Sequence, residues 1–138
     1  MIYSERYLSD MERSLNCLIL GETTFDNIFT LDICTKNIID NKMINKSQLK
    51  VSHLKALIWN KKTHVGKFKV KDPDSLNLWK VDISEIDEDK LKYVSVEKDI
   101  EDKLGGKILR PGKFYSTYFP DDEKPTENVR IIVVLPLI

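Results

Sequence analysis

Two short segments at opposite ends of the chain are apolar on nearly every residue. The first is residues 15–20 and the second is residues 129–136. Because neighbouring side chains of a β-strand point to opposite faces of a sheet, a strand that is apolar throughout needs cover on both faces. Such strands belong in the middle of a sheet. The sequence therefore predicts a sheet whose central strands are the first and the last of the fold.

A hairpin is predicted around Gly21. The apolar run of residues 15–20 stops at this glycine, and a second run follows at residues 28–33. In the second run apolar and polar residues alternate, which is the pattern of a half-buried strand. The apolar face of this strand consists of Phe29, Leu31 and Ile33.

One amphipathic helix and a third strand follow the hairpin. Ser47 stands where an N-cap belongs, and the helix is predicted to run to about residue 62, before a core strand at residues 76–81. Joining strands through one helix places that helix across one face of the sheet. We expect an α+β fold of the β-grasp (ubiquitin-like) class, a mixed sheet with one main helix packed on one face, formed by residues 15–138 as one domain. The buried side of the helix consists of Leu49, Val51, Leu54, Leu57 and Ile58.

The remaining segments are assigned from shorter patterns. Residues 1–14 form an N-terminal arm that is either a short helix or a frayed terminus, and residues 35–46 form a loop. Residues 64–73 alternate lysines with apolar residues, as an edge strand does. Residues 91–104 fit helix and coil equally. The chain also predicts turns at residues 105–106, 110–112 and 121–125, and an aromatic cluster packed under the sheet at residues 114–119.

A single helix leaves one face of the predicted sheet without a cover. Apolar side chains of the central strands would then approach solvent on that face. A monomer rarely exposes a contiguous apolar patch much above about 400 Å². Two interpretations stay open: the loops of the chain fold over this face, or another protein does.

Composition excludes several classes of protein. The 22 basic and 22 acidic residues cancel, so no net field attracts nucleic acid or an acidic membrane. No apolar run approaches the roughly 18–20 residues that cross a bilayer, and the first residues lack the basic start and apolar run of a signal peptide. Cys17 and Cys34 are too few for a disulfide framework and are expected to be reduced, buried thiols.

No motif for catalysis, metal binding or cofactor binding is visible. His53 and His64 lack the carboxylate or cysteine neighbours that complete a metal face. The glycines of residues 105–107 resemble the end of a phosphate-binding loop, but Glu101 stands where that motif requires glycine. We therefore expect no enzyme, no cofactor, no metal and no small-molecule substrate.

Charge is uneven along the chain. Residues 36–71 hold ten lysines against one acid, and residues 72–102 hold eleven acids against four lysines, which gives +9 and −7. If the fold separates these segments, the molecule is dipolar and its faces orient partners. If they intermix, they only solubilise the protein, and an acidic run by itself is usually a solvated loop. The candidate interface residues are Lys67, Lys69, Lys71, Glu85, Asp87, Glu88 and Asp89.

Three segments taken in order resemble the N-terminal domain of Crinkler effectors. They are Leu-Asn-Cys-Leu-Ile-Leu-Gly at residues 15–21, Leu-Asn-Leu-Trp-Lys-Val at residues 76–81 and Arg-Ile-Ile-Val-Val-Leu-Pro at residues 130–136. The last is similar to the family's His-Val-Leu-Val-x-x-Pro boundary, with Arg130 in place of histidine. The first matches the family's Leu-x-Leu-Phe-Leu-Ala-Lys loosely and lacks its Ala-Lys end. The chain ends shortly after the boundary proline, where the family's C-terminal domain would follow.

The resemblance assigns two sets of motif residues. The residues that are similar to the family's translocation motif are Leu15, Cys17, Leu18, Ile19, Leu20 and Gly21. The domain-boundary residues are Arg130, Ile131, Ile132, Val133, Val134, Leu135 and Pro136.

The resemblance also implies a function. It implies a non-catalytic, ubiquitin-like module of effectors that plant-associated oomycetes and fungi secrete, linked to translocation into host cells, with separate C-terminal domains that often act in the host nucleus. The residues themselves favour association with a protein, either a host protein or a second copy as a homodimer. The alternative is an intracellular scaffold domain of the Phox-and-Bem type, which assembles through opposed basic and acidic faces. Salt-sensitive oligomers would favour the scaffold.

Overall fold

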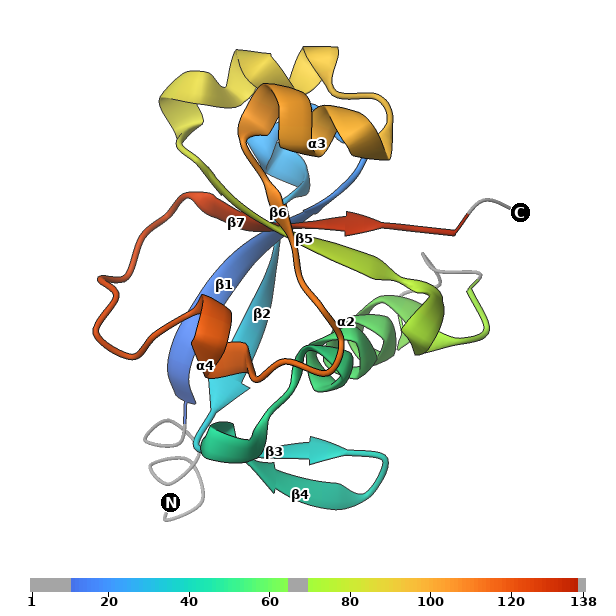
Figure 1. Cartoon of the computed structure of the whole chain (residues 1–138), viewed down its shortest axis with the longest axis vertical. Helices are drawn as coiled ribbons and strands as arrows, with labels where there is room; N and C mark the ends of the chain where they lie inside the picture. Colours follow the sequence, from blue (N-terminus) through green and yellow to red (C-terminus); the bar gives the residue numbers. More distant parts are fainter. Residues whose placement is uncertain (1–10, 65–69, 137–138) are drawn as a thin grey trace.

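A five-stranded mixed sheet forms the centre of the computed structural model, which describes residues 11–64 and 70–136 (Figure 1). The strands lie in the order β2-β1-β7-β5-β6, with β1 parallel to β7 and the other neighbours antiparallel. The prediction that the first and last strands lie side by side within the sheet is therefore confirmed. The strands are β1 (Met11–Ile19), β2 (Phe29–Cys34), β5 (Asn77–Ile83), β6 (Lys107–Ile108) and β7 (Val129–Val134).

Both faces of the sheet are buried, which accounts for the apolar runs. All six residues of β7 are buried. In β1, Leu15 and Cys17 join the core under one face, and Leu18 joins the core under the other. β2 has the predicted alternation, since its buried residues are separated by half-buried or exposed ones.

The main helix, α2 (Val51–His64), covers one face of the sheet. Its fully buried Leu54 and Ile58 pack in the same core as Tyr115 and Phe119, whose rings stack 5.5 Å apart beside the single turn α4 (Tyr115–Tyr118). Tyr115 and Phe119 of the predicted aromatic cluster therefore pack under the sheet, Tyr118 is half-buried, and Phe114 is 46% exposed. The α+β class, with a mixed sheet and a main helix on one face, is confirmed and is consistent with a β-grasp-like fold.

The start of α2 differs from the predicted one. Ser47 is not its N-cap but lies in the 3-10 turn η2 (Lys46–Gln48), and the helix begins at Val51. The main-chain N–H of Lys50 donates a hydrogen bond of 2.8 Å to Nδ1 of His53. His53 thus satisfies a donor at the helix start, which is the role that the sequence assigned to Ser47.

The face opposite α2 has a cover of its own (Figure 1). It is made by the 3-10 helix η4 (Glu85–Tyr93) and by α3 (Glu97–Leu104). Leu91, Val94 and Ile100 are buried against the sheet there, while the acidic side chains between them stay at the surface or half-buried. Of the two interpretations left open, the one in which the chain itself covers this face is therefore right, although short helices and not loops form the cover.

Residues 36–45 form a hairpin and not the predicted loop. β3 (Lys36–Ile39) pairs antiparallel with β4 (Lys42–Asn45). Asp40 and Asn41 between them have φ values of 51° and 64°. Two residues with positive φ make the tight turn whose twist suits a hairpin, and Asp and Asn tolerate that conformation.

Two further predictions concern segments that are only partly described. Residues 11–14 of the expected arm belong to β1, and residues 1–10 lie outside the described residues. Of the expected edge strand at residues 64–73, residues 65–69 lie outside the described part, His64 ends α2, and residues 70–72 are not in a strand. The remaining short elements are η1 (Phe25–Asn27) and η3 (Pro73–Ser75).

Candidate functional site

The residues similar to a translocation motif form the second half of β1 and the turn after it. Leu15, Cys17 and Leu18 are buried, and the strand is paired on both sides, by β2 and by β7. Burial raises the pKa of the Cys17 thiol to about 12, so the thiol stays protonated at neutral pH. The side chains of Ile19 and Leu20 and the exposed Gly21 are the part of the segment that reaches the surface.

The boundary residues lie directly beside this segment. Residues 131–134 are buried in β7, and the main-chain N–H of Leu20 donates to the carbonyl oxygen of Val133 at 2.8 Å. Leu20, Leu135 and Pro136 line one pocket of about 450 Å³. The two motifs that carry the family resemblance therefore end together at one surface of the molecule.

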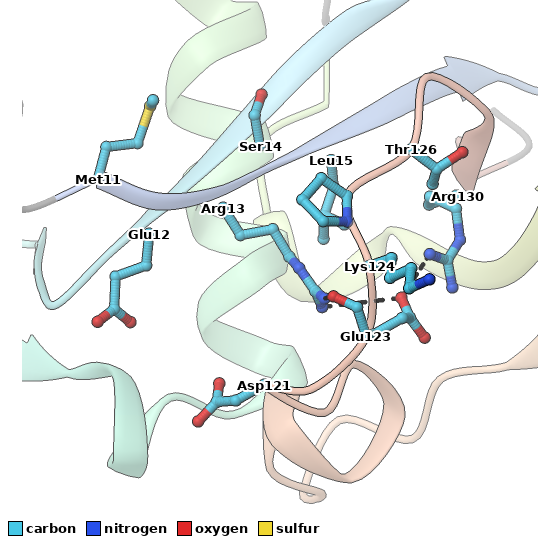
Figure 2. A pocket seen from close by; sticks show the side chains of 11 residues that line it. Met11, Glu12, Arg13, Ser14, Leu15, Asp121, Glu123, Lys124, Thr126 and Arg130 are labelled. Carbon is cyan, nitrogen blue, oxygen red and sulfur yellow. Dashed lines mark hydrogen bonds and ion pairs between the residues drawn. The ribbon is translucent and has the colours of Figure 1, made fainter.

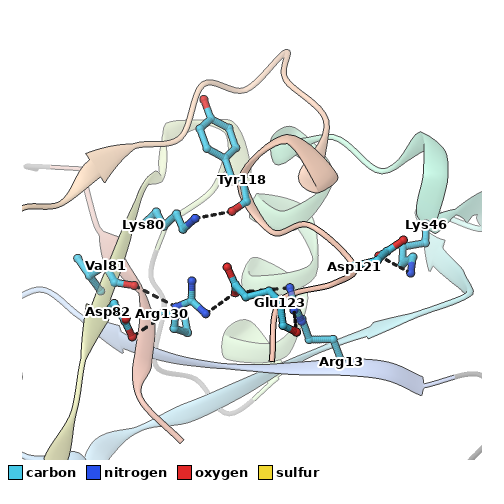
Figure 3. Close-up of polar contacts among 9 residues, drawn as sticks. All are labelled: Arg13, Lys46, Lys80, Val81, Asp82, Tyr118, Asp121, Glu123 and Arg130. Carbon is cyan, nitrogen blue, oxygen red and sulfur yellow. Dashed lines mark hydrogen bonds and ion pairs between the residues drawn. The ribbon is translucent and has the colours of Figure 1, made fainter. Parts of the chain in front are cut away.

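Arg130 is the second residue of β7 and is only 6% exposed. Its Nε donates to the carbonyl oxygen of Val81 at 3.2 Å, and its Nη1 donates to the carboxylate of Glu123 at 2.5 Å (Figure 3). The guanidinium also lies 5.5 Å from the ring centroid of Phe119. The sequence placed Arg130 in the boundary motif, but nothing near it in the chain indicated these partners.

Glu123 lies in the loop before β7 and is contacted by arginines of two strands, β1 and β7. Figure 2 shows Arg13 of β1 and Arg130 of β7 both reaching toward it at the wall of a pocket of about 420 Å³. Arg13 Nη2 donates to the main-chain oxygen of Glu123 at 2.8 Å, and Arg13 Nη1 lies 3.8 Å from the carboxylate. The hydrogen bond from Arg130 holds the pKa of Glu123 below its ordinary value. Arg13 Nη1 is buried and has no hydrogen-bond partner among the described residues, so the ion pair with Glu123 is its nearest compensation. The two arginines together hold Glu123 and its loop against β1 and β7, an arrangement that we call the Arg130 clamp.

Two further ion pairs, both made by Lys46, stabilise the same region. Lys46 contacts the carboxylates of both Glu12 and Asp121. Hydrogen bonds to these two acids raise the pKa of Lys46, and the bond from Lys46 lowers the pKa of Asp121. The lysine therefore links the start of β1 to the segment that follows α4.

The candidate interface residues lie on opposite sides of the sheet where they are described. Lys71 is exposed in the coil before η3, which packs on α2, whereas the four acids at 85, 87, 88 and 89 belong to η4 on the other face. Lys67 and Lys69 lie outside the described residues. Glu88 accepts a hydrogen bond of 2.7 Å from the main chain of Phe25, so this acid has an internal partner. The four acids of the candidate interface that lie in η4 are Glu85, Asp87, Glu88 and Asp89.

The described ranges offer neither a metal cluster nor a membrane-spanning helix. No group of three or more histidine, cysteine or acidic side chains is placed to hold a metal ion there. The His53 side chain is engaged at the start of α2, and desolvation together with Lys50 lowers its pKa. No helix within residues 11–64 and 70–136 has the length and apolar character needed to span a bilayer.

An apolar surface that the sequence analysis missed lies on the β3–β4 hairpin. Ile38 and Met43 are directly opposite each other in the ladder and are 69% and 63% exposed. With Leu57 of α2 and with Asp32 and Cys34 of β2 they line a pocket of about 320 Å³, which we call the hairpin groove. The apolar pairs on both sides of Asp40-Asn41 were the sequence signal for this hairpin.

Comparison with known proteins identifies the family. The profile of the Crinkler effector protein N-terminal domain matches residues 14–134, from β1 to the end of β7. A curated relative, Crinkler effector protein 1 of Rhizophagus irregularis, is 35% identical over 126 residues, which cover 91% of this chain and 22% of the relative. No solved structure matches the chain significantly. The chain belongs to the family of Crinkler effector N-terminal domains.

Proposed function

We propose that this domain is a non-catalytic, ubiquitin-like module of a secreted Crinkler-type effector, which serves delivery into host cells and association with other proteins. The position of the two motif segments supports this proposal. They are adjacent parallel strands, joined at their ends by the hydrogen bond from Leu20 to Val133. A receptor would therefore meet the surface of a folded domain, because the motif residues Leu15 to Leu18 are not available as an extended peptide.

Delivery is tested with the domain fused in front of a reporter and secreted by a plant-colonising fungus. The reporter is then measured in the host cytoplasm and nucleus. Leu20→Ser changes the surface end of the motif, and Ile86→Ser, at a residue 93% exposed on η4, is the matched control. We expect the control to enter host cells like the unchanged domain and Leu20→Ser to lose most of the signal. Entry of the reporter without the domain would contradict delivery.

The separation of charge across the sheet supports a second candidate, a scaffold that assembles head to tail. The basic side of one copy, at α2 and the hairpin, would face the acidic η4 and α3 of the next. Exposed ion pairs weaken with salt, so oligomers should form at about 0.05 M salt and dissociate at about 0.5 M. Sedimentation velocity measures this. Glu85→Lys with Asp89→Lys should abolish assembly, whereas Glu127→Lys should not, and a monomer at both salt concentrations would contradict the scaffold.

A further inference from the structure

We propose that the outer edge of β2 and the hairpin groove beside it bind an extended peptide segment of a partner protein, aliphatic at its centre and acidic at its flanks, as an added strand. The inference rests on the proposed association function and names the chemistry of the partner. An exposed strand edge is the surface on which proteins most readily add a strand from another chain. The edge, the apolar groove and the lysines around it are separate observations.

The hydrogen-bond partners of β2 show which of its main-chain N–H and C=O groups point away from the sheet. β2 ends the sheet, with β1 as its one neighbour in the ladder. The N–H and C=O of Cys34 both bond to the side chain of Asn37 at 2.9 Å, outside that ladder, and Lys61 Nζ donates to the carbonyl of Thr30. In an antiparallel strand alternate residues direct their main-chain groups to the same side. Asp32, between Thr30 and Cys34, therefore points its N–H and C=O away from the sheet.

The two ends of this edge are closed and its middle is open. Asn37 occupies one end, and Lys61 occupies the carbonyl at the other. Among the described residues none bonds to the outward main-chain groups of Asp32. A short peptide can therefore pair with β2 at Asp32, and it gains further carbonyl and N–H partners if the Lys61 side chain swings away. Closed ends of this kind limit the length of strand that another chain can add.

Apolar contacts for such a peptide lie beside the open residue. The hairpin groove has Ile38, Met43 and Leu57 as its apolar lining, next to Asp32 itself. Ile38 and Met43 are the cross-strand pair on the outward face of the hairpin. Because side chains of a strand alternate, every second residue of the added peptide would reach this lining. These residues favour an aliphatic centre for the bound segment.

The charge around the groove selects the flanks of the peptide. Lys36 and Lys42 are exposed on the hairpin and Lys61 is exposed at the end of α2, whereas the Nζ of the half-buried Lys62 lies 3.9 Å from the centroid of the Phe29 ring. The acids nearby are Asp32 and Asp40. The excess of lysines favours acidic residues on both sides of the aliphatic centre and makes binding dependent on salt. A lipid surface would also suit lysines beside exposed aliphatic residues, but the open main-chain groups of Asp32 favour a peptide.

The test uses a fluorescent synthetic peptide with alternating valine and isoleucine between pairs of aspartates, titrated with the domain and followed by anisotropy and amide chemical shifts. We expect saturable binding that weakens with salt, with the largest shifts in β2 and the hairpin. The same peptide with a central proline should bind at least about tenfold more weakly, because it cannot form the ladder. A version with lysine flanks should also bind more weakly.

Variants of the domain separate main-chain pairing from side-chain contacts. Asp32→Pro removes the outward N–H and should weaken binding about tenfold, whereas the control Asp32→Ala keeps it and should bind at least as well. Should Asp32→Pro not fold, Ile38→Ser with Met43→Ser tests the groove, with Ile86→Ser as control. Equal binding by Asp32→Pro and Asp32→Ala would overturn the inference, as would shifts confined to η4 and α3.

Vesicles of phosphatidylserine and phosphatidylcholine provide the remaining arm of the test. Sedimentation of the domain with these vesicles, lost in Ile38→Ser with Met43→Ser and without any peptide binding, would assign the groove to a membrane surface and overturn the inference. Delivery is not measured in any of these assays. A failure of peptide binding therefore leaves the delivery proposal standing, and a failure of delivery does not alter the peptide result.

Discussion

Arg130 brings a charge into the start of the central strand β7, where its side chain is 6% exposed. A buried guanidinium costs several kcal/mol unless its donors find partners. The carbonyl of Val81 and the carboxylate of Glu123 provide them. Glu123 comes from the loop before β7, so its contact with Arg130 also holds that loop against the sheet. The packing of the loop and the ion pair between Arg130 and Glu123 therefore depend on each other.

Removing the acid should therefore be costly. Glu123→Ala removes the carboxylate that bonds to Arg130 Nη1 and leaves only the exposed Asp82, 3.9 Å from Nε, as a charged partner. We expect the free energy of unfolding to fall by about 2–3 kcal/mol, less than for a fully buried pair because Glu123 is partly exposed. Asp89→Ala, which removes an exposed partner of Lys92, should change it by at most about 0.5 kcal/mol. Urea unfolding measures both, and equal effects would contradict the clamp.

The same pair predicts a pH dependence. In the folded protein the hydrogen bond from Arg130 lowers the pKa of Glu123 below its ordinary value of 4.5. The ionised carboxylate therefore stabilises the fold at higher pH. This stabilisation is present above pH 4.5 and is lost as the pH falls through the lowered pKa. Glu123→Gln cannot titrate. The difference in unfolding free energy between the unchanged protein and this variant should shrink as the pH is lowered from 7 toward 3, and a constant difference would contradict the assignment.

At the scale of elements, the turn after α3 depends on two glycines with different roles. Gly105 ends the helix with φ of 66°, the left-handed conformation that favours glycine. Gly106 has no positive φ, but a Cβ there would lie 2.6 Å from Cγ2 of Ile100 and 3.0 Å from its main-chain oxygen. Close packing of the helix end on the sheet, and not backbone conformation, requires glycine at this position.

We predict that Gly106→Ala lowers the free energy of unfolding by about 1–3 kcal/mol, because Ile100 is fully buried and its main chain cannot move aside. Gly112→Ala is the matched control, since a Cβ at Gly112 meets nothing within 4 Å. It should be within about 0.5 kcal/mol of the unchanged protein. Thermal unfolding compares the two, and a neutral Gly106→Ala would show that α3 packs more loosely than described.

The cover formed by η4 and α3 makes a prediction of its own. Ile100→Ala removes a fully buried side chain from the core between α3 and the sheet and should cost about 2–4 kcal/mol. It should also increase binding of a dye that reports exposed apolar surface. Ile86→Ala, at a residue 93% exposed on η4, should do neither. If both variants behaved alike, the second face of the sheet would not depend on this cover.

At the scale of the whole molecule, strands and the main helix were predictable because their signals are local. The apolar run of residues 131–134 and the alternation in β2 identify strands directly, and the spacing of apolar residues identifies α2. The cover of the second face was not predictable, since Leu91, Val94 and Ile100 are separated by mostly charged and polar residues and lack a regular period. The Arg130 clamp was not predictable either, because its partners come from distant segments.

The candidate site was predictable as a pair of segments but not as a surface. Sequence similarity identified residues 15–21 and 130–136 as motifs, and their pairing in the sheet followed from their apolar character. The hairpin groove depends on a turn at Asp40-Asn41 and on the side chain of Asn37 bonding to Cys34. Such contacts between side chains and main chain determine where a hairpin packs. The pattern of apolar and polar residues in this segment does not predict them.

The proposed function depends on the motif segments being folded central strands. Hydrogen exchange of single amides, followed by NMR at neutral pH, measures this most directly. The amides of residues 17–19 and 131–134 should exchange among the slowest in the domain, at rates set by global unfolding, because they lie in paired strands and, apart from the half-buried Ile19, are buried. Fast exchange in residues 17–19, with protection kept in β7, would show that the first motif is a detachable segment and would contradict the proposed function.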